Sequence, residues 1–111
     1  MIDAAAAHPG CTVRIAGDGP QRGTVEAAAA RLDNLEYLGW LDRGALLSAL
    51  DASDLLVLPS QVEAFGTVAL EAMARGRVTL VSPGCGIADW PEFAPGLRVM
   101  AAEETVEQAL E

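Results

Sequence analysis

Two carboxylates, Glu63 and Glu71, are separated by seven residues in a stretch that is otherwise mostly apolar. Glu71 is the only charged residue between Gly66 and Arg75. A carboxylate among apolar neighbours is costly unless it is paired, and a vicinal diol such as a ribose would supply two hydrogen-bond donors. The pattern therefore makes Glu71 a candidate for binding a diol. The alternative is that Glu71 lies on a solvent-facing stripe of a helix and Glu63 on an exposed loop, as most carboxylates do.

A glycine, Gly66, stands between the two carboxylates, at the predicted start of a helix. A glycine allows a ligand to approach the backbone closely, and the first amides of a helix have no partner within it. The amides of Gly66, Thr67 and Val68 would therefore lie at the positive end of a helix, which suits a pyrophosphate.

The elements that must position these residues follow from local signals. A buried apolar run ends at Pro59-Ser60, just before Glu63, and Gly76 is placed as a helix stop. The sequence predicts helices at Asp3–His8, Thr24–Leu32, Asp42–Ala49, Gly66–Arg75 and Glu103–Leu110, and strands at Thr12–Ala16, Leu35–Leu38, Asp54–Leu58, Val78–Val81 and Leu97–Val99. Alternating strands and helices with short loops predict an α/β fold with a parallel sheet covered on both sides. Since ligands of such sheets bind beyond the carboxyl ends of the strands, the loop bearing Glu63 would lie at the site.

Composition excludes several classes of function. The 111 residues carry a net charge of -9, with seven arginines and no lysine, so neither nucleic acid nor an anionic membrane is an expected partner. The missing lysine excludes a P-loop. One histidine and two cysteines, Cys11 and Cys85, give no metal-binding set. With no long apolar run and no signal peptide, we expect one cytoplasmic domain over residues 1–111 with reduced thiols and no membrane insertion.

The block from Pro59 to Gly76, with its Glu-x7-Glu pair, resembles the signature of the group 1, retaining glycosyltransferases of GT-B architecture. Other segments are similar in order to those of the family, over most of the chain from about Thr12 to Val99. These segments are the glycine loop Ile15–Pro20, the strand end Tyr37–Trp40, the strand Ala52–Ser60 and the turn Cys85–Asp89. The resemblance implies a Rossmann-like, doubly wound parallel sheet forming the C-terminal, donor-binding half of such an enzyme.

The resemblance also implies roles for individual residues. Glu71 would hold the ribose of a nucleotide-diphosphate sugar, and Glu63 would contact hydroxyls of the donor sugar at the catalytic centre. The diphosphate would be surrounded by Phe65, Gly66, Thr67 and Val68. The base would pack near Leu38, Gly39 and Trp40. The loop glycines Gly17 and Gly19 would also belong to the donor-binding site. Such an enzyme transfers a sugar with retention at the anomeric carbon and needs no metal or other cofactor. Its protein groups stabilise charge on the departing diphosphate.

The chain departs from the family pattern in ways that bear on activity. The family's donor domain opens with a strand and a loop whose arginine and lysine neutralise the diphosphate, and this sequence begins after that point. The N-terminal acceptor domain is also missing. Val78 and Asp89 stand where the family usually has Pro and Glu. We therefore expect a fragment of a two-domain enzyme that is inactive alone.

The missing first strand also affects the sheet. In the family pattern it would lie between Thr12–Ala16 and Asp54–Leu58. We expect these two strands to pair directly, or a partner strand to insert between them, because open edges favour association with another chain.

Several residues keep two interpretations. Gly17-Asp18-Gly19 could cradle phosphate or form a tight strand-to-helix turn. Trp40 is either a core or loop aromatic or a platform for the base. Trp90 and Phe93 are expected to pack the C-terminal loop, and His8 and Glu104 to be solvated. A receiver-like signalling module also suits this length, but it needs a phosphoacceptor Asp after its central strand, where Pro59-Ser60 stands. A non-catalytic nucleotide-binding fragment is the other alternative.

Overall fold

The computed structural model describes residues 1–111, and the chain forms two compact units. Unit one consists of Met1–Asp42 together with Thr105–Glu111, and unit two of Arg43–Glu104. None of the helices is long and apolar enough to cross a bilayer.

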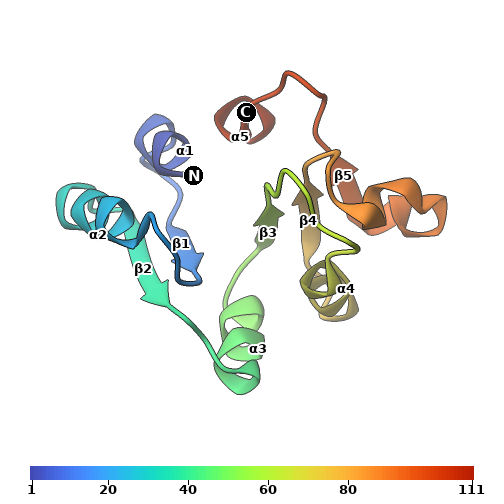
Figure 1. Ribbon diagram of the computed structural model, residues 1–111, viewed down its shortest axis with the longest axis horizontal. Helices are drawn as coiled ribbons and strands as arrows, with labels where there is room; N and C mark the ends of the chain where they lie inside the picture. The colour runs from blue at the N-terminus through green and yellow to red at the C-terminus, as the bar shows by residue number, and fades with distance from the viewer. The chain divides into compact units, whose positions relative to one another are not determined.

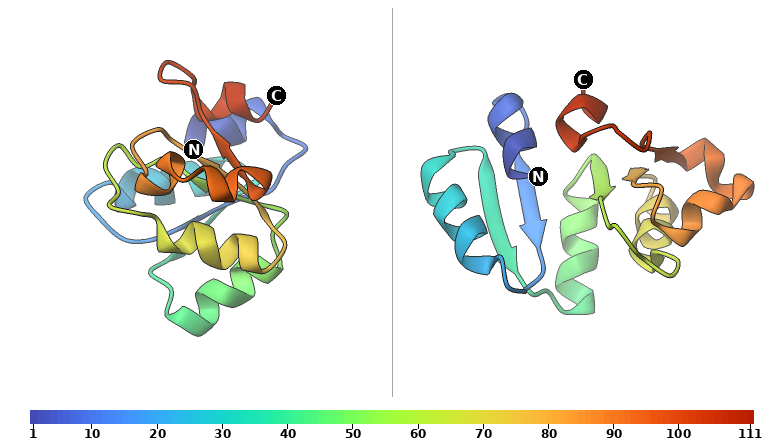
Figure 2. Two further views of the ribbon diagram at one scale, coloured as in Figure 1. Left: turned by 90° about the vertical axis from the view of Figure 1, so that its right-hand side faces the viewer. Right: turned by 45° about the horizontal axis from the view of Figure 1, so that its top comes forward.

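Unit one is a β-α-β arrangement closed by a helix at each end of the chain (Figure 1). Its elements are α1 (Ile2–Ala7), β1 (Val13–Ala16), α2 (Arg22–Arg31), β2 (Leu35–Gly39) and α5 (Val106–Ala109). The two strands run parallel, from the pair Val13–Leu35 to the pair Ala16–Gly39. The helix α2 packs along β2, and α1 lies beside α5 (Figures 1 and 2).

The core of unit one is small and rich in alanine. Ala5 of α1 and Ala28 of α2 are buried with Val13 and Leu35. Alanine has a high helix propensity and a small side chain, so each helix forms readily and approaches the strands closely.

Asn34 joins the segments of unit one. Its Nδ2 donates to the carbonyl oxygens of Ala5 at 2.8 Å, His8 at 3.1 Å and Cys11 at 2.9 Å. These carbonyls lie at the end of α1 and in the turn that follows it, so one side chain fixes the path of the chain from α1 into β1.

The contact between α1 and α5 uses a side chain that was expected to be solvated. The ring Nε2 of His8 lies 2.8 Å from the carbonyl oxygen of Glu107. Thr105 begins α5 with a capping box, in which its hydroxyl accepts from the amide of Gln108 and the Gln108 side chain accepts from the amide of Thr105.

Unit two is a parallel sheet in the order β3-β4-β5 with helices between the strands. Its elements are α3 (Arg43–Asp51), β3 (Leu55–Leu58), α4 (Thr67–Ala74), β4 (Val78–Val81), two 3-10 helices η1 (Gly86–Asp89) and η2 (Pro91–Gly96), and β5 (Leu97–Val99). Ala69 of α4 packs with Val81, Cys85 and Ile87 to form the core. Gly76 adopts the left-handed conformation after α4, with φ +73°, as predicted for a helix stop.

The predicted element types and the parallel pairing are confirmed, but the direct pairing of the first and third strands is wrong. β1 pairs with β2 and β3 pairs with β4, in two separate sheets. The first ladder of each sheet joins strands linked by one crossover helix, α2 or α4. β1 and β3 are not joined by a single crossover helix, and strands that are not consecutive in the chain pair less often than consecutive ones.

The C-terminal region differs from prediction in detail. The loop after β4 contains η1 and η2, and the final helix starts at Val106 instead of Glu103. Glu104 lies before α5 instead of on its face, and its side chain, 20% exposed, accepts from the amide of Ala101 at 3.0 Å and from Arg98 at 2.7 Å. The backbone hydrogen bond from Ala101, followed by that from Arg98, lowers the pKa of Glu104.

The bonds made by Asn34 give a first prediction. Asn34→Asp keeps the shape of the side chain but replaces the donating amide nitrogen with a carboxylate oxygen, which faces three carbonyl oxygens and cannot donate to them. We expect this change to lower the free energy of unfolding by about 2 kcal/mol or more. Urea unfolding at neutral pH, with hydrogen exchange to locate the loss in unit one, would measure this. The neighbouring Asp33→Asn exchanges the same groups at an exposed position and should be close to neutral. Equal stabilities of the two variants would contradict this account.

Candidate functional site

In unit one, the predicted glycine loop borders an open cavity of about 430 Å³ at the carboxyl ends of β1 and β2. Gly17, Gly19, Arg22 and Tyr37 are among the residues that line it. Gly17 has a φ of +124°, a conformation that favours glycine, and its amide donates to the carbonyl of Gly39 at 2.7 Å. The fold thus brings together Gly17 and Gly39, which are far apart in the sequence.

The remaining predicted residues of unit one lie near this strand end. The hydroxyl of Tyr37 donates to the carbonyl of Gly17 at 2.7 Å, which ties the two strands together. Leu38 is partly buried, whereas the side chain of Trp40 is 74% exposed. Trp40 is therefore not a core residue, and its flat surface faces water.

The charged groups of the glycine loop are already engaged with one another. The amide of Gly19 donates to Oδ1 of Asp18 at 2.9 Å, and Arg22 lies 2.8 Å from Glu26 and 3.5 Å from Asp18. The hydrogen bond from Arg22 to Glu26, with the charges of Glu26 and Asp18, raises the pKa of Arg22 further above its usual value. Since the Gly19 amide is used locally, these contacts favour a tight turn over a phosphate cradle at Gly19.

In unit two, the loop that carries Glu63 is held by backbone hydrogen bonds to the loop after β4. The amide of Glu63 donates to the carbonyl of Gly84 at 3.1 Å, and the carbonyl of Glu63 accepts from Gly86 at 2.9 Å. The amide of Ile87 donates to the carbonyl of Phe65 at 2.9 Å. The backbones lie so close that a Cβ on Gly84 would come within 1.9 Å of the carbonyl oxygen of Gln61, and one on Gly86 within 2.0 Å of that of Ala64.

Gly66 joins this braced loop to α4. It is buried, has a φ of +99°, and stands at the N-cap position of the helix. A Cβ built on Gly66 would lie 3.0 Å from Leu58 and 3.7 Å from Cγ of Glu63. The side chain of Glu63 therefore passes close to the start of α4. The first amides of α4 follow directly, with Thr67 exposed and Val68 partly buried.

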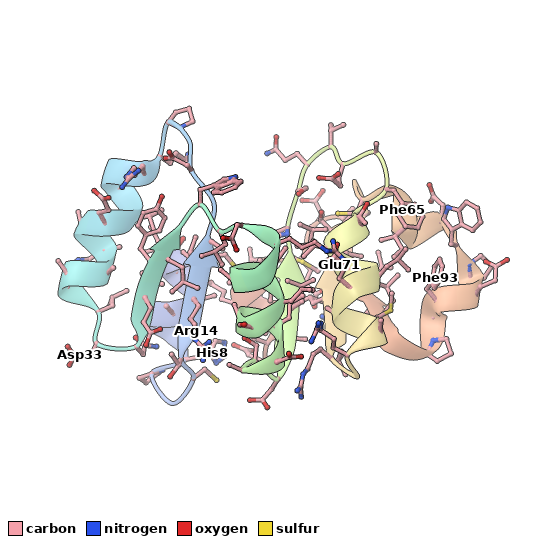
Figure 3. All side chains as sticks on the ribbon, turned by 90° about the horizontal axis from the view of Figure 1, so that it is seen from below. His8, Arg14, Asp33, Phe65, Glu71 and Phe93 are labelled. Carbon is pink, nitrogen blue, oxygen red and sulfur yellow. The ribbon has the colours of Figure 1, made fainter.

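Glu71 lies on the side of α4 that faces α3 (Figure 3). Its side chain is 17% exposed, so it does not belong to a solvent-facing stripe. Oε1 accepts from Nη1 of Arg43 at 3.0 Å, whereas Oε2 is buried and has no hydrogen-bond partner. A buried carboxylate oxygen without a donor is unusual, because burial removes the water that would otherwise solvate it.

Phe65 belongs to an aromatic cluster with Trp90 and Phe93. Its ring centroid lies 6.0 Å from that of Trp90 and 6.3 Å from that of Phe93, both in edge-to-face geometry, and Figure 3 shows Phe65 and Phe93 on neighbouring segments. The expectation that Trp90 and Phe93 pack the C-terminal region is confirmed. The cluster fixes η1 and η2 against the Glu63 loop.

Sequence reasoning missed Arg43 and Gly84. The apolar neighbours of Glu71 indicate that its carboxylate requires a partner. Which of the seven arginines becomes that partner depends on the tertiary structure. Gly84 carries no signal beyond its place in a turn. Cys11 and Cys85 are free thiols, exposed and buried respectively, and no group of three or more His, Cys, Asp or Glu is placed to hold a metal ion.

The parallel α/β fold agrees with a comparison to known families. The family model described as "Glycosyl transferases group 1" matches residues 1–91. The chain belongs to this family.

Individual members of the family support the assignment. The chain is 42% identical over 78 residues to a glycogen synthase of Mycobacterium tuberculosis, an alignment that covers 68% of this chain and 19% of the relative. It is 40% identical over 77 residues to a 2-deoxystreptamine N-acetyl-D-glucosaminyltransferase of Streptomyces fradiae, covering 67% of this chain and 18% of the relative. The chain thus spans about a fifth of the length of these glycosyltransferases.

Solved structures agree with the predicted GT-B type of fold. WaaG, a glycosyltransferase involved in lipopolysaccharide biosynthesis, matches with a TM-score of 0.74 and 29% identity, over 96% of this chain and 30% of WaaG. Anabaena HepE in complex with UDP matches with a TM-score of 0.74 and 24% identity, over 98% of this chain and 32% of HepE.

The contact between the two loops of unit two gives a second prediction. Gly86→Ala forces a Cβ against a backbone carbonyl that cannot rotate away, so the loop carrying Glu63 must move. We expect a loss of about 2 kcal/mol or more in the free energy of unfolding, measured by urea unfolding. Gly23→Ala is the control, since its Cβ would meet nothing within 4 Å and alanine favours a helix. A Gly86→Ala protein as stable as the Gly23→Ala protein would refute the close contact.

Proposed function

We propose that this chain forms the donor-binding part of a retaining glycosyltransferase and binds a nucleotide-diphosphate sugar. The ribose would be held by Glu71, the diphosphate by the amides of Gly66, Thr67 and Val68, and hydroxyls of the sugar by Glu63. No metal is needed in this proposal.

The observation that carries the proposal is the state of the Glu71 carboxylate. It is largely buried in an apolar helix, yet one of its oxygens has no hydrogen-bond partner. The two adjacent hydroxyls of a ribose would give both oxygens a donor, with charge-assisted hydrogen bonds. A vicinal diol is an uncharged group that can donate one hydrogen bond to each oxygen of a carboxylate.

The start of α4 supports the same ligand. Gly66 adopts a backbone conformation that few other residues tolerate, and it leaves the first turn of α4 without a side-chain cap. Unpaired amides at a helix N-terminus stabilise phosphate oxygens. Glu63 passes near this helix end, within reach of a group attached to a diphosphate there. HepE, which shares the fold, has been solved with UDP and with UDP-glucose.

The proposed chemistry follows from these positions. When the bond from the anomeric carbon to the diphosphate breaks, negative charge develops on the departing phosphate oxygens. Fixed amides at the start of α4 would stabilise that charge without having to reorganise. Glu63 would orient the sugar through its hydroxyls, and Glu71 would hold the nucleotide in place through the ribose. The sugar would then pass to an acceptor with retention of configuration.

A binding role without catalysis is the second candidate. Both candidates use the same nucleotide site and differ only in turnover. A receiver-like function has less support, because β3 ends before Pro59-Ser60 and not at a phosphoacceptor Asp.

The role of Glu71 gives a third prediction. Glu71→Gln keeps the shape but loses charge-assisted acceptance, so affinity for uridine or guanosine diphosphate should fall by about 1.5–3 kcal/mol, roughly ten- to a hundredfold in Kd. Isothermal titration calorimetry would measure it on the 111-residue chain. Glu92→Gln makes the same change of charge at an exposed position of unit two and should leave the Kd unaltered. Unchanged binding by Glu71→Gln, or no nucleotide binding by the wild-type chain, would refute the proposal.

Turnover gives a fourth prediction. The 111-residue chain alone should transfer little or no sugar from UDP- or GDP-linked donors, because the proposed site accounts for the donor and not for the acceptor. Release of UDP or GDP, followed by a coupled assay with simple sugar acceptors, would measure this. Robust turnover that purifies with the chain and is lost in Glu63→Gln would show that the chain is a complete enzyme.

A further inference from the structure

The proposed ribose-binding carboxylate is already occupied by a side chain of the same unit. Nη1 of Arg43, the first residue of α3, donates to Oε1 of Glu71 on α4 at 3.0 Å. The two residues are 28 positions apart, so this contact is made by the tertiary fold and not by a helical repeat.

The two partners of this ion pair differ greatly in exposure. The side chain of Arg43 is 73% exposed, whereas that of Glu71 is 17% exposed. Because Arg43 is so exposed, its guanidinium is hydrated almost equally well inside and outside the pair. Ion pairs with such an exposed partner contribute little to the free energy of unfolding. Glu71, by contrast, loses its only donor if Arg43 leaves and nothing replaces it.

The pair satisfies the carboxylate incompletely. Oε2 is enclosed and has no donor, so a single guanidinium contact leaves one oxygen of Glu71 unpaired. A vicinal diol carries two donors at a spacing that matches the two oxygens. In this proposal the departure of Arg43 returns the guanidinium to water and uncovers Oε2, so that a diol gives Glu71 one more hydrogen bond than Arg43 does.

Arg43 is not needed to hold α3 on α4. At the other end of these helices, Arg75 pairs with Asp51, and Nη2 of Arg77 donates to the carbonyl of Asp51 at 2.9 Å. These contacts connect the segment at the end of α4 with the last residue of α3 and do not involve Glu71. These contacts do not depend on Arg43, so they remain when its side chain leaves Glu71.

We propose that Arg43 occupies the ribose position of Glu71 in the unliganded protein and is displaced when the nucleotide binds. It acts as an internal competitor that keeps the buried carboxylate paired until a diol arrives. This inference rests on the proposed function of Glu71. It adds that Arg43 lowers the affinity for the nucleotide below the affinity that the same site would have without the arginine.

The test is the sign of the change in affinity. Arg43→Gln cannot form the ion pair, so the Kd for uridine or guanosine diphosphate, measured by calorimetry, should fall about two- to fivefold, the range expected for loss of an exposed pair. Arg75→Gln is the matched control, because it removes the same charge and breaks the other ion pair between α3 and α4. Removing a positive charge without removing a competitor should leave the Kd unchanged or raise it.

The outcomes separate the two proposals. Tighter binding by Arg43→Gln than by Arg75→Gln supports displacement, and equal or weaker binding overturns it. Arg43→Met, which keeps the stem of the side chain and removes every donor, should repeat the result if the glutamine variant melts at a lower temperature. Glu71→Gln tests the site itself. If it binds as the wild type does, the ribose assignment fails and displacement fails with it, whereas a weakened Glu71→Gln with an unaltered Arg43→Gln rejects displacement alone.

Discussion

The candidate site of unit two depends on a backbone-to-backbone contact between two loops. The carbonyl and amide of Glu63 bond to residues of the loop after β4, and Gly84 and Gly86 leave no room for a side chain where the loops meet. The contact fixes the segment from Glu63 to Gly66, and with it the direction in which α4 begins. Glu63, the first amides of α4 and Glu71 one turn further along all take their positions from this contact. The loop between β3 and α4 is eight residues long, and this contact holds its second half, from Glu63 to Gly66, in place.

Electrostatics adds a second constraint, because the chain carries sixteen acidic residues and only seven arginines. The arginines are used at defined places. Arg22 is engaged with Glu26 and Asp18 beside the glycine loop, Arg98 with Glu104, and Arg75 with Asp51. The pair formed by Arg43 and Glu71 is thus part of a wider pattern in which few cations are placed at specific sites.

Much of the fold and of the candidate site followed from local sequence signals. The apolar runs at Leu55–Leu58 and Val78–Val81, the helix stop at Gly76 and the Glu-x7-Glu spacing are each signals that span a few residues. The structure has two strands, a helix end and a largely buried Glu71 at these places. What could not be predicted depends on contacts between distant segments. The pairing of β1 with β2 and of β3 with β4, the close approach at Gly84 and the choice of Arg43 as the partner of Glu71 depend on such contacts. Glu104 was misjudged for the same reason, because its partner Arg98 and the amide of Ala101 come together only when the chain turns after β5.

The way the Glu63 loop is braced affects how such a protein can diverge. The hydrogen bonds that hold the loop involve main-chain atoms, and the side chains of Gln61, Val62 and Ala64 point into solvent, with Val62 90% exposed. Substitutions at these three positions leave the brace intact, since every residue type except proline supplies the same amide and carbonyl groups. The surface next to Glu63 can therefore change in a lineage while the two glycines and the start of α4 are inherited unchanged.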